Sequence, residues 1–282
     1  HNYRLICIAA TLFRDGKTCE KCVFGSRFSG AIHRCYRNSW IGSVAITSSK
    51  TMLKRANSWL DLVGAFIVLS EFARKKFIEA GLPSQRIVVK PNFTTGLEPE
   101  NESPSDHAFG LYIGRLSTEK GILSLLKAWP SSEYGLRIAG EGPILSKLRD
   151  YSDKKITYLG HLPTTRIRQQ LSSASFLVMP SEMYETFGMT IIEAFSQGTP
   201  VIVSGHGAMA EIVDDGVTGL HFRPGDADDL KEKIIWAFEN PLEMQRMGAR
   251  ARDVHRERYS PEANYPALMN IYRSVIDQAK SL

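Results

Sequence analysis

The 282-residue chain is long enough for one large domain or two ordinary ones, and its 43% hydrophobic content is normal for a globular protein. No apolar run approaches the ~18 residues that span a bilayer, so no segment is predicted to cross a membrane. The net charge of +5 is uneven, because residues 1–92 contain 15 Lys and Arg against 5 Asp and Glu, whereas the remainder contains 20 against 25. We therefore expect the first segment to meet an anionic partner. A membrane surface or a phosphorylated lipid is favoured over nucleic acid, because the sequence has no recognition-helix, zinc-finger or ribonucleoprotein motif.

The beginning of the chain holds all of its cysteines. It opens with His1, without Met and without the apolar core of a signal peptide, so we expect it to be a piece of a longer protein. Residues Arg4–Ala10 are apolar enough to predict the end of a strand. The cysteines, within 29 positions, include one Cys-x-x-Cys pair and could form a tetrahedral zinc site or remain free thiols, and disulfides are disfavoured because nothing indicates export. They are Cys7, Cys19, Cys22 and Cys35.

A helix is predicted over Trp40–Leu60. Its pattern places Ile41, Val44, Ala45, Met52, Leu53 and Leu60 inward and Lys50, Lys54 and Arg55 outward. Such a helix either lies on an anionic bilayer or is packed normally with a solvated basic face.

From Val63 the pattern becomes α/β. A strand at 65–69 is followed by a helix from Ser70, its N-cap, to Gly81, and by a strand at 86–89. Residues 93–107 lack periodicity and are interpreted as an interdomain linker.

A second, complete α/β unit follows, and its regular alternation predicts a parallel, doubly wound sheet. Its predicted strands are Phe109–Ile113, Leu136–Ala139, Ile156–Leu159, Phe176–Met179, Val201–Val203 and Gly219–Phe222. Predicted helices lie at Ile122–Trp129, Ile144–Tyr151, Thr164–Ser172, Phe187–Gln197 and Ala208–Val213, and three more form the C-terminus at Asp228–Glu239, Pro241–Tyr259 and Pro261–Gln278.

The segment from Ser181 to Pro200 carries the strongest functional signal. It joins a buried strand to a helix, with Glu185 in the loop and Glu193 two turns along the helix. In an open α/β sheet, such a junction places free helix N–H groups where an anionic ligand binds. The alternative is a helix-start acid plus a solvated glutamate.

The run Glu185-Thr186-Phe187-Gly188, Glu193-Ala194 and Gly198-Thr199-Pro200 resembles the donor-sugar motif of GT-B glycosyltransferases, in particular retaining family 4. This resemblance implies an α/β fold of GT-B type: a complete C-terminal Rossmann-like doubly wound domain plus the remaining part of an N-terminal Rossmann-like domain. The implied domains are a partial acceptor-side domain with a cysteine-bearing insert at 1–92, the linker, a nucleotide-sugar domain at 108–258, and a helix at 259–282 that crosses back to the N-terminal domain.

Cations for a diphosphate are expected after the first strand of the second unit. Gly114 and Arg115 close this strand and Lys120 precedes the next helix, so a guanidinium fork, a mobile ammonium and helix N–H groups are available there. The resemblance implies that both cations hold the diphosphate. The two glutamates would repel phosphate at contact range but accept hydrogen bonds from sugar hydroxyls, so we expect them to face the sugars.

The resemblance also implies the remaining site residues. Glu193 would bind the ribose and Glu185 the donor sugar, while the turns at Gly140, Gly142 and His161 would contact the nucleobase. Backbone amides at Phe187 and Gly188 would contact phosphate or sugar, and His1 resembles the histidine that approaches the donor from the N-terminal domain. The form Gly205-His206-Gly207 departs from the family's commoner pattern and leaves the role of Glu211 open.

The implied reaction transfers a sugar from a nucleoside diphosphate (UDP or GDP) to a hydroxyl of a glycan, lipid-linked or small-molecule acceptor, with retention and without a required metal. The alternatives are a nucleotide-sugar epimerase, or a fragment that binds the donor without turnover. We expect a cytoplasmic location, with peripheral contact to the inner face of the membrane, and no nucleic-acid partner.

Overall fold

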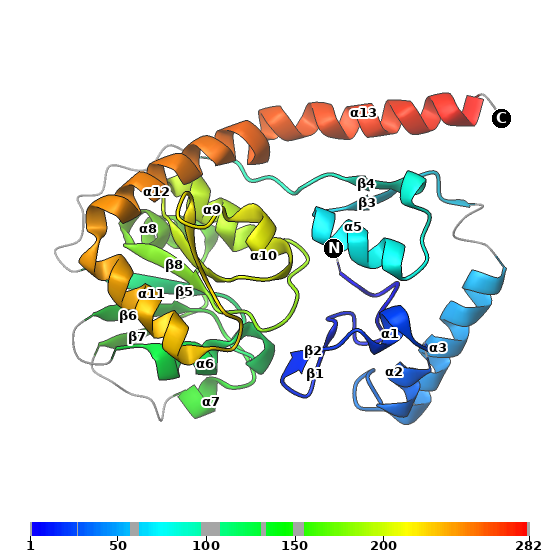
Figure 1. Ribbon diagram of the computed structural model, residues 1–282, viewed down its shortest axis with the longest axis horizontal. Coiled ribbons are helices and arrows are strands. Elements are labelled where there is room, and N and C mark those ends of the chain that lie inside the picture. The colour runs from blue at the N-terminus through cyan, green and yellow to red at the C-terminus, as the bar shows by residue number, and fades with distance from the viewer. Residues whose placement is uncertain are drawn as a thin grey trace. The chain divides into compact units, whose positions relative to one another are not determined.

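The computed structural model describes residues 2–26, 28–56, 62–96, 108–130, 134–148 and 155–280 (Figure 1). Contacts divide the chain into two compact units. The first contains 1–92, the loop Met183–Phe187 and residues 264–282, and the second contains 93–182 and 188–263. A short loop that precedes a helix of the second unit therefore belongs to the first.

The second unit is built on a six-stranded parallel sheet (Figure 1). The strands are β5 (Phe109–Ile113), β6 (Gly135–Ala139), β7 (Ile156–Gly160), β8 (Phe176–Met179), β9 (Val201–Ser204) and β10 (Gly219–Phe222). Their spatial order is β10-β9-β8-β5-β6-β7, so the direction of winding reverses between β5 and β8. This is the strand order of a Rossmann sheet, in which ligands bind beyond the carboxyl ends of the two strands at the reversal.

Helices connect the parallel strands, and the reversal of strand order requires helices on both faces of the sheet. The helix α6 packs with α11, whereas α8 and α12 pack with α9. The interior strands β8 and β9 are buried at every residue, which explains why Phe176–Met179 and Val201–Val203 are continuous apolar runs rather than alternating ones. The helices are α6 (Ile122–Ala128), α7 (Leu145–Leu148), α8 (Thr164–Ser173), α9 (Met189–Gln197), α10 (Gly207–Ile212), α11 (Ala227–Glu239) and α12 (Pro241–Val254), with short turns η2 (Thr118–Lys120) and η4 (His255–Tyr259).

The predicted α/β class and the parallel sheet are confirmed, and the six predicted strands agree with the observed ones to within a residue at each end. Two helix boundaries differ for local reasons. The helix predicted from Phe187 begins at Met189, because Gly188 has φ 110° and ends the preceding loop in a left-handed conformation. The helix predicted to reach Tyr259 ends at Val254 and is followed by a π turn. The predicted helix at 144–151 is α7, and residues 149–151 lie outside the described residues.

The first unit contains a two-stranded parallel sheet and several helices. Ser70 caps α5 as predicted, because its Oγ accepts a hydrogen bond from the Ala73 N–H at 3.1 Å. Residues 264–280 of α13 also belong to this unit, and the Asn264 side chain donates a hydrogen bond to the Pro91 carbonyl at 2.7 Å. Its elements are β1 (Phe13–Arg14), β2 (Lys17–Thr18), α1 (Lys21–Phe24), α2 (Ser29–Ile32), α3 (Trp40–Arg55), β3 (Phe66–Val68), α5 (Glu71–Glu79), η1 (Ser84–Arg86), β4 (Ile87–Val89) and α13 (Pro261–Lys280).

The strand end predicted at Arg4–Ala10 is wrong. The N–H groups of Ile6 and Cys7 both bond to the Tyr3 carbonyl, and Ala10 has φ 68°, so the segment forms tight turns. Tyr3, Ile6 and Cys7 are buried within the first unit, which accounts for their apolar pattern without a strand.

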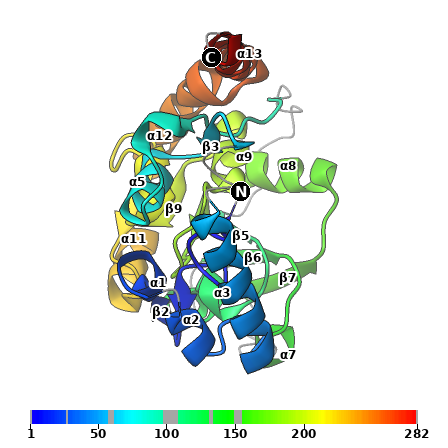
Figure 2. The ribbon, with the colours of Figure 1, turned by 90° about the vertical axis from the view of Figure 1, so that its right-hand side faces the viewer.

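The prediction for the helix at Trp40–Leu60 is wrong in its orientation. The helix α3 lies beside α2 (Figure 2) and buries Ser43 and Thr47 completely, whereas Ile41 is 76% exposed and Met52 is 70% exposed. Buried hydroxyls are tolerated because both bond to backbone: Ser43 accepts from the Tyr36 N–H at 2.9 Å, and Thr47 donates to the Ser43 carbonyl at 2.7 Å. The end of the predicted helix, 57–60, lies outside the described residues.

Candidate donor site in the second unit

The loops after β5 and β8 are joined where the strand order reverses. The Glu182 N–H donates to the Glu119 carbonyl at 3.0 Å, and the Ser181 hydroxyl donates to the same carbonyl at 3.4 Å. The Ser124 hydroxyl on α6 donates to the Glu182 carboxylate at 2.6 Å. These bonds fix the turn that carries Lys120 against the loop that leads to α9.

Glycines allow these loops to approach one another closely. A Cβ on Gly121 would overlap the Pro180 carbonyl, and a Cβ on Gly140 would overlap the Gly114 carbonyl. Gly121 and Gly140 also have φ of +69° and +141°, which side chains rarely adopt. A Cβ on Gly142 would likewise overlap the backbone after β5. The predicted ligand-facing glycines therefore have a structural role in bringing the strand ends together.

The two predicted phosphate cations lie on the turn after β5. Arg115 is exposed, and its carbonyl accepts a hydrogen bond from the Tyr112 hydroxyl at 2.9 Å, while the next residue, Leu116, is fully buried. Lys120 is half-buried at the end of η2. A buried anchor between two solvent-accessible cations keeps the turn in place while leaving the Arg115 side chain available to an anion.

Glu193 lies on α9, the helix that begins after the β8 loop. It is half-buried, and burial raises the pKa of its carboxyl group, an effect that the nearby Arg168 guanidinium opposes. Arg168 lies on α8, which packs against α9, and its side chain donates to the Thr95 hydroxyl at 3.5 Å. Sequence reasoning missed Arg168, since only the packing of two helices brings it near the carboxylate.

The third strand ends next to the second. The Gly140 N–H donates to the Gly160 carbonyl at 2.7 Å, which joins the ends of β6 and β7. His161, the next residue, is exposed. The structure therefore places His161, Gly140 and Gly142 along the same edge of the sheet as Arg115.

Glu185 and Phe187 are part of the first unit. Glu185 is buried, and its carbonyl accepts a hydrogen bond from the Tyr3 hydroxyl at 3.3 Å. The ring of the preceding residue, Tyr184, packs on Phe72 with centroids 4.7 Å apart. The Lys76 ammonium lies 6.0 Å from the centroid of the Tyr184 ring. Lys76 also forms ion pairs with Glu20 at 2.8 Å and Glu79 at 3.0 Å.

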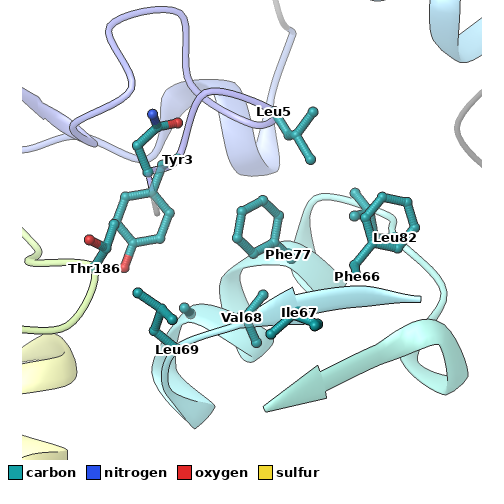
Figure 3. A pocket seen from close by; sticks show the side chains of 11 residues that line it. Tyr3, Leu5, Phe66, Ile67, Val68, Leu69, Phe77, Leu82 and Thr186 are labelled. Carbon is teal, nitrogen blue, oxygen red and sulfur yellow. The ribbon is translucent and has the colours of Figure 1, made fainter. Parts of the chain in front are cut away.

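A cavity of about 130 Å³ adjoins this loop within the first unit. Figure 3 shows Tyr3 beside Thr186, and Phe77, the β3 residue Val68 and the following Leu69 complete the apolar wall. Sequence reasoning missed Tyr3, whose burial holds the Glu185 loop. His1, the remaining predicted catalytic residue, lies outside the described residues.

The cysteines are free thiols. Burial raises the pKa of Cys22 and of Cys35, and neighbouring cysteine thiols raise both further. Within the described part of the chain, no group of three His, Cys, Asp or Glu side chains is arranged to hold a metal ion. In the same residues, no helix is both long and apolar enough to cross a bilayer.

Comparisons with known proteins agree with the geometry of the second unit. The sequence model of the family described as "Glycosyl transferases group 1" matches residues 95–254. An uncharacterized glycosyltransferase of Methanocaldococcus jannaschii is 28% identical over 176 residues, which cover 61% of this chain and 50% of that protein. The glycogen synthase of Mycobacterium tuberculosis is 34% identical over 152 residues, which cover 50% of this chain and 36% of that protein.

Solved structures show the same fold. The sucrose-phosphate synthase of Thermosynechococcus elongatus has a TM-score of 0.71 at 24% identity and covers 82% of this chain and 62% of that one. Anabaena HepE in complex with UDP-glucose has a TM-score of 0.64 at 21% identity, with coverage of 78% and 64%. The chain spans about half the length of the first curated relatives that it matches, 50% and 46%.

Proposed function

Because the chain belongs to the glycosyl transferases of group 1, we propose that it transfers a sugar from a nucleoside diphosphate sugar to an acceptor hydroxyl, with retention at the anomeric carbon. The observation that carries the proposal is the joined β5 and β8 loops at the reversal of a Rossmann-ordered sheet. Two cations on the first loop suit the diphosphate of a nucleotide sugar, and a glutamate on the helix after the second loop suits its neutral hydroxyl groups.

Each side chain is assigned by its chemistry. Arg115 and Lys120 hold the diphosphate and stabilise its charge as it leaves. Glu193 accepts hydrogen bonds from the ribose hydroxyls, and the backbone at Gly140, Gly142, His161 and Gly188 lines the nucleotide. Burial of the Glu193 carboxyl group supports this role, because a half-buried acceptor favours neutral diols over phosphate.

The donor sugar is assigned to the loop held by Tyr3. Glu185 and the backbone of Phe187 bind its hydroxyls, and the Tyr3 and Tyr184 contacts fix the conformation of this loop. His1 belongs to the same proposal as the histidine of the N-terminal domain. The division at residues 1–92, 93–107, 108–258 and 259–282 remains our proposed domain organisation.

The proposed transfer step needs no metal ion, and each bond that forms in it is matched by one that breaks. The bond between the anomeric carbon and the diphosphate oxygen breaks, and the acceptor oxygen bonds to the same face of that carbon. The acceptor proton passes to the departing diphosphate oxygen. Arg115 and Lys120 supply the positive charge that a metal ion would otherwise provide.

The donor carries UDP or GDP, and HepE, which has been solved with UDP-glucose, supports UDP as the first candidate. The acceptor is a glycan, a lipid-linked sugar or a small molecule. A cytoplasmic location with peripheral contact to the membrane remains a prediction based on the basic charge of residues 1–92.

A panel of UDP- and GDP-sugars tests the proposal, with release of nucleoside diphosphate measured with and without glycan and lipid-linked acceptors. We expect acceptor-dependent release, loss of UDP affinity in Glu193→Gln, and loss of sugar selectivity with UDP affinity retained in Glu185→Gln. The exposed Glu232→Gln is the matched control and leaves both unchanged. Acceptor-independent release of sugar and nucleotide would instead indicate the epimerase alternative, and identical effects of the first two variants would contradict the division of roles.

A further inference from the structure

The helix α3 presents an apolar face to solvent. Residues Ile41, Ala45 and Met52 follow one another at helical spacing and are exposed, and Ile41 and Met52 are 76% and 70% exposed. Ser48 and Ser49 extend the same face, and among the residues of α3 whose side chains the structure describes this face carries no charge. Lys50 points away from it, toward the carbonyls of Arg4 and Cys7. The usual arrangement of an amphipathic helix is therefore inverted.

The neighbouring helices continue this exposed apolar character. Phe28, which precedes α2, and Ile32 within it are 52% and 71% exposed, and Trp40 at the start of α3 is 58% exposed. The helices α2 and α3 pack side by side (Figures 1 and 2). Isolated exposed apolar residues are ordinary, but this many on two adjoining helices indicates a surface that is covered by a partner.

The same segment has only one sign of charge. Residues 21–60 contain seven Lys and Arg and no Asp or Glu, with Glu20 and Asp61 as the flanking acids. Lys21, Arg34 and Arg37 are exposed, and the guanidinium of Arg37 lies 5.4 Å from the Tyr36 ring centroid. Exposed aromatic and aliphatic side chains are thus interspersed with cations.

We propose that the surface formed by α2 and α3 docks on an anionic lipid bilayer. Ile41 and Met52 would enter the boundary between headgroups and acyl chains, and Trp40 would lie at the headgroup level, where its ring is favoured. Arg34 and Arg37 would bind lipid phosphates. This proposal assigns the membrane contact to particular residues. It rests on the proposed function in one respect, which is that the contact would bring the protein to a lipid-linked acceptor.

Charge distinguishes the bilayer from other partners. A second copy of the chain would place two acid-free basic surfaces against each other, which like-charge repulsion disfavours. Nucleic acid would pair with Arg34 and Arg37 but would leave the stripe from Ile41 to Met52 exposed to water. An anionic bilayer pairs its lipid phosphates with the cations and buries the apolar side chains at the same time.

Flotation of the full chain with vesicles tests the proposal. We expect binding to vesicles of phosphatidylcholine with phosphatidylglycerol, weak binding to phosphatidylcholine alone, and weaker binding at high salt. Ile41→Ser/Met52→Ser should lower the partition coefficient at least tenfold, because two apolar side chains no longer enter the bilayer. Arg34→Gln/Arg37→Gln should lower it about 30-fold, since each basic residue near the surface contributes roughly fivefold.

Matched controls lie on the second unit. Leu242 is 77% exposed, nearly the same as Ile41, and Lys231 and Arg256 are exposed cations. Leu242→Ser and Lys231→Gln/Arg256→Gln should leave vesicle binding unchanged, and circular dichroism should show every variant folded. UDP affinity, measured on the same samples, separates failure of this surface from failure of the donor site.

Three results would overturn the proposal. The first is no binding to anionic vesicles by the folded chain, and the second is equal loss of binding in the surface and control variants. The third is a concentration-dependent dimer, or a complex with nucleic acid, that Ile41→Ser/Met52→Ser abolishes while vesicle binding is absent.

Discussion

Replacing Gly121 with alanine tests the structural basis of the proposed donor site. Gly121 has φ +69°, and an added Cβ would overlap the Pro180 carbonyl of the β8 loop. The left-handed conformation costs a residue with a Cβ about 1–2 kcal/mol. Displacing a packed backbone carbonyl adds about 1–3 kcal/mol, by analogy with overpacked cores. We therefore expect Gly121→Ala to lower the free energy of unfolding by about 2–5 kcal/mol.

Gly216→Ala is the matched control. Gly216 has nearly the same φ, +72°, but no atom lies within 4 Å of an added Cβ, so only the backbone cost of about 1–2 kcal/mol applies. The difference between the two variants isolates the contact between the β5 and β8 loops. For a unit of this size, each kcal/mol corresponds to a change in melting temperature of about 2–4 °C.

Thermal and denaturant unfolding measure the two losses, and calorimetry with UDP measures the functional effect. We expect Gly121→Ala to weaken UDP binding because the turn that carries Lys120 must move, and Gly216→Ala to leave it unchanged. Equal stability losses in the two alanine variants would refute the reasoning that the two loops are held in backbone contact.

The remaining predictions concern titration and loop packing. Burial raises the pKa of Glu193 above its ordinary value of 4.5, so its stabilising contribution is present below that pH and is lost as the pH rises through the folded-state pKa. Glu193→Gln should therefore gain stability relative to the parent above pH 4.5, and unchanged pH profiles would exclude this effect. Burial lowers the pKa of His255 from 6.5, so the contribution of this side chain to stability is present above pH 6.5 and is lost on acidification. Its Nε2 donates a hydrogen bond to the Thr94 carbonyl at 3.1 Å. Unfolding of His255→Gln followed between neutral and acidic pH should show a flatter profile than that of the parent. Tyr184→Leu removes the ring pair with Phe72 and should cost about 0.5–1.5 kcal/mol in denaturant unfolding, whereas full retention of stability would show that the pair contributes little.

The sheet of the second unit could be predicted because its signals are local. The fully apolar runs Phe176–Met179 and Val201–Val203 are bounded by Pro180, Pro200 and Ser204, and such runs between helical periods indicate buried parallel strands. The positions of Arg115 and Lys120 at a strand end followed directly from the same pattern.

Other features depend on packing that the sequence pattern does not encode. The orientation of α3 was predicted from its apolar residues, yet the hydrogen bonds of Ser43 and Thr47 allow its polar face to be buried. Arg168 was missed because its relation to Glu193 arises from the packing of two helices. Tyr3 was missed because it is 182 positions from Glu185 in sequence.

The binding of UDP to Arg115→Ala and Lys120→Ala, measured by calorimetry, tests the central claim most directly. Each substitution removes a charge-assisted interaction worth about 1.5–3 kcal/mol, so each should lower affinity roughly 10- to 150-fold. Lys127→Ala, an exposed cation on α6, is the control and should bind UDP like the parent. Affinity unchanged in both Arg115→Ala and Lys120→Ala would contradict the assignment of this turn to a nucleoside diphosphate.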